Sequence, residues 1–241
     1  MQEVKFRLEP EVFGTFVKAV ASLIYESRLH LDEDTMRVFA TSPDNVCLVD
    51  AMVKHNSQLE ERKVIGVNWE SLDGYRLDGV FDWKTNIQVT IFDEWMEISP
   101  ASGEDVIKIS LIDPTGIRKE PRKDTLARFE KLFTTEVEVH EFSRIVYKHS
   151  AFGDVLKVTS SEGVCFFETE HEDSIQTNVG RAEGEDATAF YSLEYLKEIA
   201  NGLDFAEWVK IKYATNKPMI VSAENDDLRV RYVLAPRYEV E

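Results

Sequence analysis

The chain has 241 residues, which is room for one large domain or for two ordinary domains with cores of their own. Its 43% hydrophobic and 30% charged residues are ordinary for a globular protein, but its formal net charge of −17 is not, and taken alone it argues against a nucleic-acid binder. A local basic surface stays compatible with that sum. The sequence shows neither an apolar run of membrane-spanning length nor a signal-peptide core near its start. We therefore expect neither a transmembrane helix nor a secretory signal peptide.

The first half of the chain predicts an amphipathic helix followed by strands. Residues 11–25 place apolar side chains at helical spacing, and Pro10 suits the first turn of that helix. The elements expected next are a hairpin of residues 29–31 and 36–40, strands at 45–53 and 64–67, a short helix at 69–77, and strands at 87–91, 96–98 and 106–112.

The second half repeats this order of elements. Val137 and Val139 lead into a helix expected at 141–149, and Ser192 is expected to cap a later helix that ends at Gly202. The strands expected around these helices are a hairpin of 156–158 and 164–167, one at 175–179 before an acidic loop at 183–186, and three at 209–213, 219–221 and 228–234. Corresponding elements lie roughly 120 to 130 residues apart, which indicates a duplicated domain. We therefore predict an α+β fold in which each half is an antiparallel sheet covered on one side by two short helices.

The segment between the halves, residues 111–129, is expected to be a connector. Pro114, Gly116 and Pro121 interrupt any helix or central strand and favour an extended course. Five basic residues crowd into this stretch of an otherwise acidic chain: Arg118, Lys119, Arg122, Lys123 and Arg128. The expected divisions are a first domain at 1–112, a connector at 113–128 and a second domain at 129–241.

Motifs of catalysis are missing from the sequence. It contains no G-x-S-x-G, no S-x-x-K, no phosphate-binding loop and no G-x-G-x-x-G, and its five histidines do not pair with Cys or carboxylates at metal-ligand spacing. We expect no catalytic residue, no metal and no cofactor. A disulfide between Cys47 and Cys165 is compatible with the sequence. Two cysteines so far apart fit an intracellular reducing compartment, with both thiols reduced, better than a disulfide.

Five segments, in order, resemble one family. VASLIYESRLHLDEDTMRVFATSPDNVCLVD is similar to the first helix and hairpin of sliding clamps, the proliferating cell nuclear antigen family, and VIGVNWESL to their strand-to-helix passage. LIDPTGIRKEP resembles the archaeal connector, FYSLEYLKEIANGL the last helix, and YVLAPR the terminal signature. The resemblance covers nearly the whole chain. It implies two-domain subunits that close head to tail, three at a time, into a ring around duplex DNA, with helices lining the hole and sheets outside.

The resemblance also implies which surfaces act. DNA would face the polar sides of the helices, which carry Lys18, Arg76, Arg144, Lys148 and Lys197. The alternative interpretation is that these are ordinary solvated helix faces, and acidic neighbours such as Glu194 and Glu198 imply weak DNA attraction. Partner peptides with aromatic and aliphatic anchors would enter a pocket under the connector formed by Thr41, Val46, Leu48, Ile117, Pro218, Leu234, Ala235 and Pro236. Val46, Leu48 and Leu234 are equally compatible with plain strand core.

Ring closure would pair two exposed strand edges. The residues expected there are Ile107, Ile109 and Leu111 on one edge and Ile175, Thr177 and Val179 on the other. The implied function is a DNA polymerase sliding clamp that is not an enzyme and binds DNA polymerase, clamp loader and other replication and repair enzymes. A clamp-like scaffold specialised for repair, or one subunit of a heteromeric ring, is the alternative. The compartment would be the cytoplasm, at the nucleoid, in an archaeon, or the nucleus in a eukaryote.

Overall fold

The computed structural model describes residues 3–57, 59, 62–75, 86–100, 105–122, 133–171 and 173–237. The chain forms two compact units. The first consists of Met1–Pro43, Val49–Glu120 and Asn225–Arg229, and the second of Asp44–Leu48, Pro121–Glu224 and Val230–Glu241. The first unit thus includes the short segment Asn225–Arg229 from the second half of the sequence, and the second unit includes Asp44–Leu48 from the first half.

The first unit holds a small sheet built from strands at its two sequence ends. Its antiparallel strands follow the order β1-β6-β7-β8, with bounds β1 Val4–Leu8, β6 Ile87–Ile91, β7 Trp95–Pro100 and β8 Ile107–Ser110. Alternation of apolar and polar residues gives this sheet one buried face, which includes Phe6, Leu8, Val89 and Ile98. The strand β1 was not expected from the sequence.

A second set of strands in this unit follows the order β4-β3-β2-β5. Their bounds are β2 Glu26–Leu31, β3 Thr35–Thr41, β4 Cys47–Lys54 and β5 Lys63–Asn68, and β4 belongs to the first unit from Val49 onward. In β2 the inner residues Ser27, Leu29 and Leu31 are buried, while Arg28 and His30 point to the outer face. That outer face of β2 is where the connector lies.

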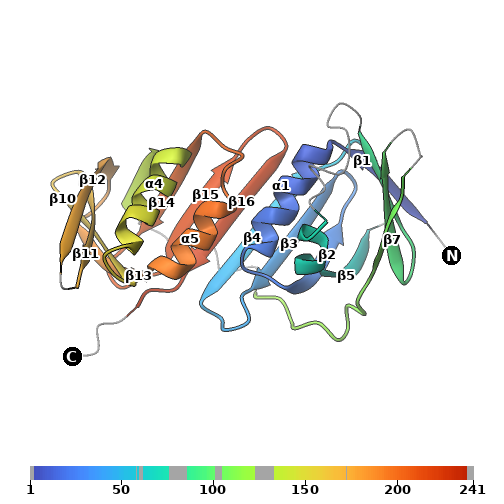
Figure 1. Cartoon of the computed structure of the whole chain (residues 1–241), viewed down its shortest axis with the longest axis horizontal. Coiled ribbons are helices and arrows are strands. Elements are labelled where there is room, and N and C mark those ends of the chain that lie inside the picture. The colour runs from blue at the N-terminus through green and yellow to red at the C-terminus, as the bar shows by residue number, and fades with distance from the viewer. Residues whose placement is uncertain are drawn as a thin grey trace. The chain divides into compact units, whose positions relative to one another are not determined.

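Two helices cover the inner face of these strands (Figure 1). Helix α1 (Pro10–Ala21) buries an apolar stripe, and α2 (Trp69–Asp73) begins with a fully buried tryptophan. The Trp69 indole N–H donates to Ser27 Oγ at 2.8 Å, and its ring meets Phe16 edge to face at 5.8 Å between centroids. This contact joins both helices to β2 through a satisfied polar group.

The second unit is an extended antiparallel sheet with the order β13-β10-β11-β12-β9-β14-β15-β16. Its strands are β9 Phe133–Glu138, β10 Val155–Ser161, β11 Val164–Glu170, β12 Ser174–Glu183, β13 Ala187–Ser192, β14 Trp208–Tyr213, β15 Met219–Glu224 and β16 Leu228–Leu234, the last from Val230 onward in this unit. Glu162 and Gly163 both have positive φ, +53° and +78°, which is the turn that a two-residue hairpin between β10 and β11 requires.

Helices α4 (Val139–Ser150) and α5 (Leu193–Asn201) lie side by side on one face of this sheet (Figure 1). The Tyr147 hydroxyl of α4 donates to Asn201 Oδ1 of α5 at 2.7 Å. Their inward residues include Phe142, Ile145 and Leu196, all buried. The predicted α+β class and the sheet-plus-two-helices arrangement are confirmed in each unit.

Several predicted boundaries are wrong. Helix α1 ends at Ala21 and not at residue 25. Helix α2 ends at Asp73 with Gly74 as its C-cap, so Gly74 and Tyr75 lie beyond the helix end, and residues 76 and 77 of the predicted helix fall outside the described residues. Strand β8 covers only Ile107–Ser110, because Leu111 N–H donates to Glu94 O and Ile112 N–H to Gly66 O in place of the ladder with β7. Helix α4 begins at Val139, two residues before the predicted start at residue 141.

Two further details of the second unit differ from expectation. Strand β13 was not expected, and Glu183 belongs to β12 where an acidic loop was predicted. Ser192 does occupy the position before α5, but its side chain makes no capping hydrogen bond; the Leu193 N–H at the helix start donates to Asp154 O at 2.9 Å. Tertiary contact therefore replaces the local cap. None of the described helices is long and apolar enough to cross a membrane.

Candidate functional site

The connector begins with a tight turn. The backbone N–H and the hydroxyl of Thr115 both donate to Asp113 Oδ1 at 2.8 Å, and Gly116 N–H donates to Asp113 O at 3.1 Å. The hydrogen bonds from Thr115 hold the pKa of Asp113 below its usual value. The expectation of a wholly extended connector is wrong here, because the Asp113 side chain folds the chain back before residues 117–122 continue without helix or strand.

Arg28 fastens this turn to strand β2. Its Nε donates to Pro114 O at 2.9 Å, and its Nη2 donates to Ile117 O at 3.0 Å. A longer contact of 3.4 Å joins Nη1 to Arg118 O. One guanidinium thus satisfies carbonyls on both sides of Gly116, and its planar fork fixes the path of the connector as well as its position.

Gly66 allows the connector to come this close. Ile112 N–H donates to Gly66 O at 2.9 Å, and a Cβ at position 66 would lie 2.4 Å from Ile112 O and 2.6 Å from Ile117 Cδ1. Any larger residue would collide with the connector backbone. The Ile117 side chain is consequently packed down on β5 and is 9% exposed.

Two more contacts hold the connector to the sheet and the adjoining loop. His30 Nε2 of β2 is hydrogen-bonded to Glu120 Oε1, and both side chains are about one-third exposed or less. Arg118 Nη1 donates to Pro43 O at 3.2 Å, at the end of β3. The described part of the connector is therefore anchored along its length to the first unit.

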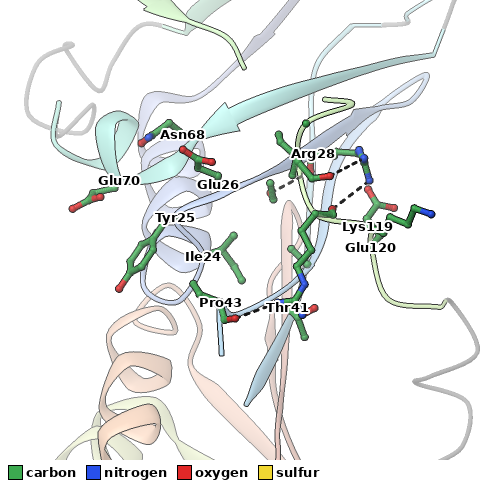
Figure 2. Close-up of a pocket in the computed structure, with 15 residues that line it drawn as sticks. Ile24, Tyr25, Glu26, Arg28, Thr41, Pro43, Asn68, Glu70, Lys119 and Glu120 are labelled. Atoms are coloured by element: carbon green, nitrogen blue, oxygen red, sulfur yellow. Dashed lines mark hydrogen bonds between the residues drawn. The ribbon is translucent and has the colours of Figure 1, made fainter. Parts of the chain in front are cut away.

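These contacts leave a groove of about 520 Å³ beside the connector (Figure 2). It brings together the predicted pocket residues Thr41 and Ile117. Its walls come from the end of α1 and start of β2, from β3 and its following loop, from the start of α2, and from the connector: Ile24–Arg28, Ala40, Thr41, Pro43, Asn68, Glu70 and Gly116–Glu120. This is a preformed cleft with an apolar floor and a charged rim.

The other predicted pocket residues belong to the second unit. Ala235 N–H donates to Val46 O at 2.8 Å, which brings these two together. Leu48 and Leu234 are buried, as strand-core residues would be, whereas Val46, Ala235, Pro236 and Pro218 keep partial exposure. Pro218 lies just before β15. The role of these six residues in partner binding stays a prediction.

The described basic residues that were predicted to face DNA lie on helices, and acidic side chains lie on the same helices. Lys18 is exposed on α1, Arg144 and Lys148 are exposed on α4, and Lys197 is half-buried on α5; Arg76 lies outside the described residues. Arg144 is bound in a two-point pair by Glu141, at 2.8 Å from Nε and 2.5 Å from Nη2. These hydrogen bonds hold the pKa of Glu141 below its usual value.

The surface of α4 and α5 is consequently close to electrical balance. Its three basic residues, Arg144, Lys148 and Lys197, are matched by Glu141 on α4 and by Glu194 and Glu198 on α5. In the described part of α2 the charged residues are Glu70 and Asp73, both acidic. An anionic polymer would be held weakly by such surfaces, through only a few phosphate contacts.

Among the strand edges of the described residues, those of β8 and of part of β12 are open. Strand β8 ends its sheet, with β7 on one side and no described strand on the other, and Ile109 is buried on its inner face. In β12, the segment from Ser174 to Arg181 pairs with β11, and only Ala182 and Glu183 reach β9. Ile175, Thr177 and Val179 are half-buried on one face of that segment, and Ile107 is half-buried in β8. Leu111 falls outside β8, so the first edge is shorter than predicted.

A buried histidine ties α4 to strands β11 and β12 of the second unit. His149 is fully buried, with Nδ1 2.9 Å from Thr169 Oγ1 of β11 and Nε2 3.0 Å from Thr177 Oγ1 of β12. Burial, reinforced by the charge of Lys148, lowers the pKa of His149 to about 4. The imidazole is therefore neutral in the folded chain at ordinary pH.

No cluster of three or more His, Cys, Asp or Glu suited to a metal ion occurs among the described residues. Cys47 and Cys165 are both buried and are not joined in a disulfide. Burial raises the pKa of the Cys165 thiol to about 11 and that of Cys47 further still. Neither thiol is thus a ready nucleophile.

Comparison with known proteins gives these features a family context. No protein-family model matches the chain. It is 27% identical over 243 residues to a DNA polymerase sliding clamp of Archaeoglobus fulgidus, covering 96% of this chain and 97% of that protein. It is 28% identical over 253 residues to the DNA polymerase sliding clamp of Methanocorpusculum labreanum, covering 99% and 100%. The A. fulgidus proliferating cell nuclear antigen (PCNA), solved with the C-terminal region of FEN-1 bound, matches with a TM-score of 0.88 and 24% identity over 98% of this chain and 99% of that one.

The chain is a homologue of the archaeal sliding clamps. Its fold is that of PCNA from end to end, so the predicted resemblance is confirmed.

Sequence reasoning missed the residues that shape the groove of this clamp homologue. Arg28 and His30 were unremarked, although their alternation with buried Ser27 and Leu29 would have placed them on the outer face of β2. Gly66 is part of the segment VIGVNWESL, and an isolated glycine in a strand indicates that another backbone segment approaches closely. The rim residues Glu26 and Glu70 carried no signal in the sequence.

Proposed function

We propose that this chain is a DNA polymerase sliding clamp, a processivity factor that encircles duplex DNA and tethers replication and repair enzymes. The observation that carries the proposal is the full-length match in fold to a PCNA solved with part of FEN-1 bound, together with the match in sequence to archaeal sliding clamps. The chain acts as a scaffold and not as an enzyme. Its working place is at the DNA: the nucleoid of an archaeal cell.

Ring closure joins three identical subunits. The edge of β8, with Ile107 and Ile109 and the adjacent Leu111, pairs with the edge of β12 that carries Ile175, Thr177 and Val179. Two unlike open edges on one subunit support this proposal, because they permit a head-to-tail contact that closes by rotation. The proposed domains of each subunit are 1–112 and 129–241, joined by the connector at 113–128.

DNA passes along the helices and is held weakly. Lys18, Arg144, Lys148 and Lys197 contact phosphates without reading sequence, and Arg76 is assigned the same role by resemblance alone. The pairing of Arg144 with Glu141 supports weak contact. Retention on DNA therefore depends mainly on the closed ring, which suits a protein that slides.

Partner peptides bind at the groove beside the connector. Thr41 and Ile117 line it, and the anchored connector supports a preformed site that loses little entropy on binding. Val46, Leu48, Pro218, Leu234, Ala235 and Pro236 are assigned to partner binding by resemblance, and their part stays to be measured.

One experiment tests the function directly. The full chain is loaded with an archaeal clamp loader onto nicked circular DNA, and the length of product made per binding event by a cognate archaeal DNA polymerase is measured with and without it. Longer products, together with loss of the protein when the circle is linearised, support a closed sliding ring. Products of unchanged length contradict the proposal.

A second candidate is a subunit of a heteromeric ring specialised for repair. The four-residue length of β8 limits the subunit contact in either ring, so the number and identity of the subunits have to be measured. Native mass measurement at micromolar concentration distinguishes the two: a trimer supports the homotrimeric clamp, and a monomer supports the heteromeric subunit.

A further inference from the structure

The groove beside the connector has two walls of opposite charge. In Figure 2, Glu26 and Glu70 lie on one side, next to Asn68, while Arg28 and Lys119 lie on the other. Glu26, Glu70 and Lys119 are exposed and enter no ion pair with any described residue. The two ends of a peptide bound across the groove would therefore experience electrostatic potentials of opposite sign.

The positive wall keeps its charge in spite of its hydrogen bonds. Arg28 donates to the carbonyl oxygens of Pro114 and Ile117, which are dipoles without net charge. Glu120, the carboxylate nearest to Lys119 in the connector, is engaged by His30 of β2. The connector side of the groove thus remains cationic although the chain as a whole is strongly acidic.

The floor between the walls is apolar and holds its shape. Ile24, Ala40 and Ile117 are buried beneath it, and Tyr25 is 57% exposed at its edge. A volume of about 520 Å³ accommodates a few side chains of an extended peptide. A nucleic acid fits poorly, because the carboxylates of Glu26 and Glu70 would repel its phosphates along one whole wall.

We propose that the groove selects partner peptides by the order of their charges: an apolar anchor with acidic residues on the connector side and basic residues toward Glu26 and Glu70. This inference rests on the proposed function, since it concerns the peptides that a clamp would tether. Charge complementarity of this kind contributes chiefly to specificity and to the association rate. A partner with the opposite charge order meets repulsion at both walls.

The test uses two fluorescent peptides of identical composition. Both carry the same aliphatic and aromatic anchors; one has two acidic residues before them and two lysines after, and the other has the reverse. Binding to the full chain is measured at low and at high salt. We expect a three- to tenfold preference for one peptide at low salt, as two partly exposed charge contacts would provide, and a smaller preference at high salt.

Charge-swapped variants make the test decisive. The double variant Lys119→Glu with Glu70→Lys leaves one charge of each sign on either wall and should abolish the preference, whereas the matched pair Lys217→Glu with Glu185→Lys, both exposed in loops of the second unit, should leave it unchanged. Equal binding of both peptides, with affinity still lost in Ile117→Ala, overturns the charge rule and leaves the proposed function standing. If neither peptide binds the wild-type chain, both proposals fail at this groove. Displacement of the peptide by a short oligonucleotide would assign the groove to nucleic acid and overturn the inference.

Discussion

The guanidinium of Arg28, on the outer face of β2, donates to the carbonyl oxygen of Ile117 across 3.0 Å. The same side chain reaches Pro114 O, three residues earlier in the connector. The connector is thus held on the sheet before any partner arrives, and the Ile117 side chain is presented at the groove in one position.

Arg28→Met should loosen the connector without unfolding the chain. It removes charge-assisted hydrogen bonds worth on the order of 1 to 2 kcal/mol to the ordered connector, so affinity for a clamp-binding peptide should fall about tenfold. Calorimetry measures the affinity, and amide exchange at Gly116 and Ile117 reports the loosening. Arg62→Met is the control, because Arg62 is largely exposed and its ion pair with Asp32 lies at the surface. Unchanged exchange in Arg28→Met would show that the connector holds without this residue.

Gly66→Ala should displace the connector by collision. The new Cβ would lie 2.4 Å from Ile112 O, so the free energy of unfolding should fall by about 1 to 3 kcal/mol, and peptide binding should weaken. Denaturant unfolding and peptide titration measure the two effects. Gly74→Ala is the matched control: its Cβ would be 3.4 Å from the nearest atom, with a helical φ of −57°, so its stability should change by less than about 0.5 kcal/mol. Equal stability of the two variants would contradict the close approach.

DNA contact should respond to charge in both directions. Replacing Lys18, Arg144 and Lys148 by Ala should lower DNA binding and flatten its salt dependence, because fewer counterions are released. Glu141→Gln should act oppositely and raise DNA affinity about two- to threefold at low salt, since it frees the charge of Arg144. Anisotropy titrations on duplex DNA at several salt concentrations measure both effects, with Glu185→Gln as control. If Glu141→Gln leaves binding unchanged, Arg144 does not face DNA.

Acid should weaken the second unit through His149. Its pKa is about 4 in the folded chain and about 6.5 when unfolded. Above pH 6.5 both states are neutral and stability is unaffected. As the pH falls from 6.5 toward 4, the unfolded chain binds a proton that the folded chain excludes, so the free energy of unfolding falls by roughly 2 to 3 kcal/mol.

The His149 contribution is isolated by comparison with His149→Gln, which keeps a polar group beside Thr169 and Thr177 but does not titrate. Unfolding free energies of both proteins are measured between pH 4 and 7.5. The wild-type curve should be the steeper of the two in that range. Parallel curves would mean that His149 is protonated in the folded chain.

The sequence by itself determined the α+β pattern of sheets and short helices and the resemblance to archaeal sliding clamps. Those conclusions depend on local periodicity, such as the helical spacing of Phe13, Phe16 and Val20, and on motifs spread along the chain, both of which are readable without contacts. Local rules also placed Ser192 just before α5, although its side chain makes no cap.

Only the tertiary structure decided how the groove is built. Arg28 and Ile117 are 89 positions apart, and Gly66 and Ile112 meet because a strand and the connector pack together. Periodicity shows which face a side chain occupies, but it cannot show which distant backbone carbonyl that side chain will satisfy. The same limit applies to the rim, where Glu26, Glu70 and Lys119 come from three separate segments. Their opposite charges can act on one bound peptide only because the fold places them on the two walls of the same groove.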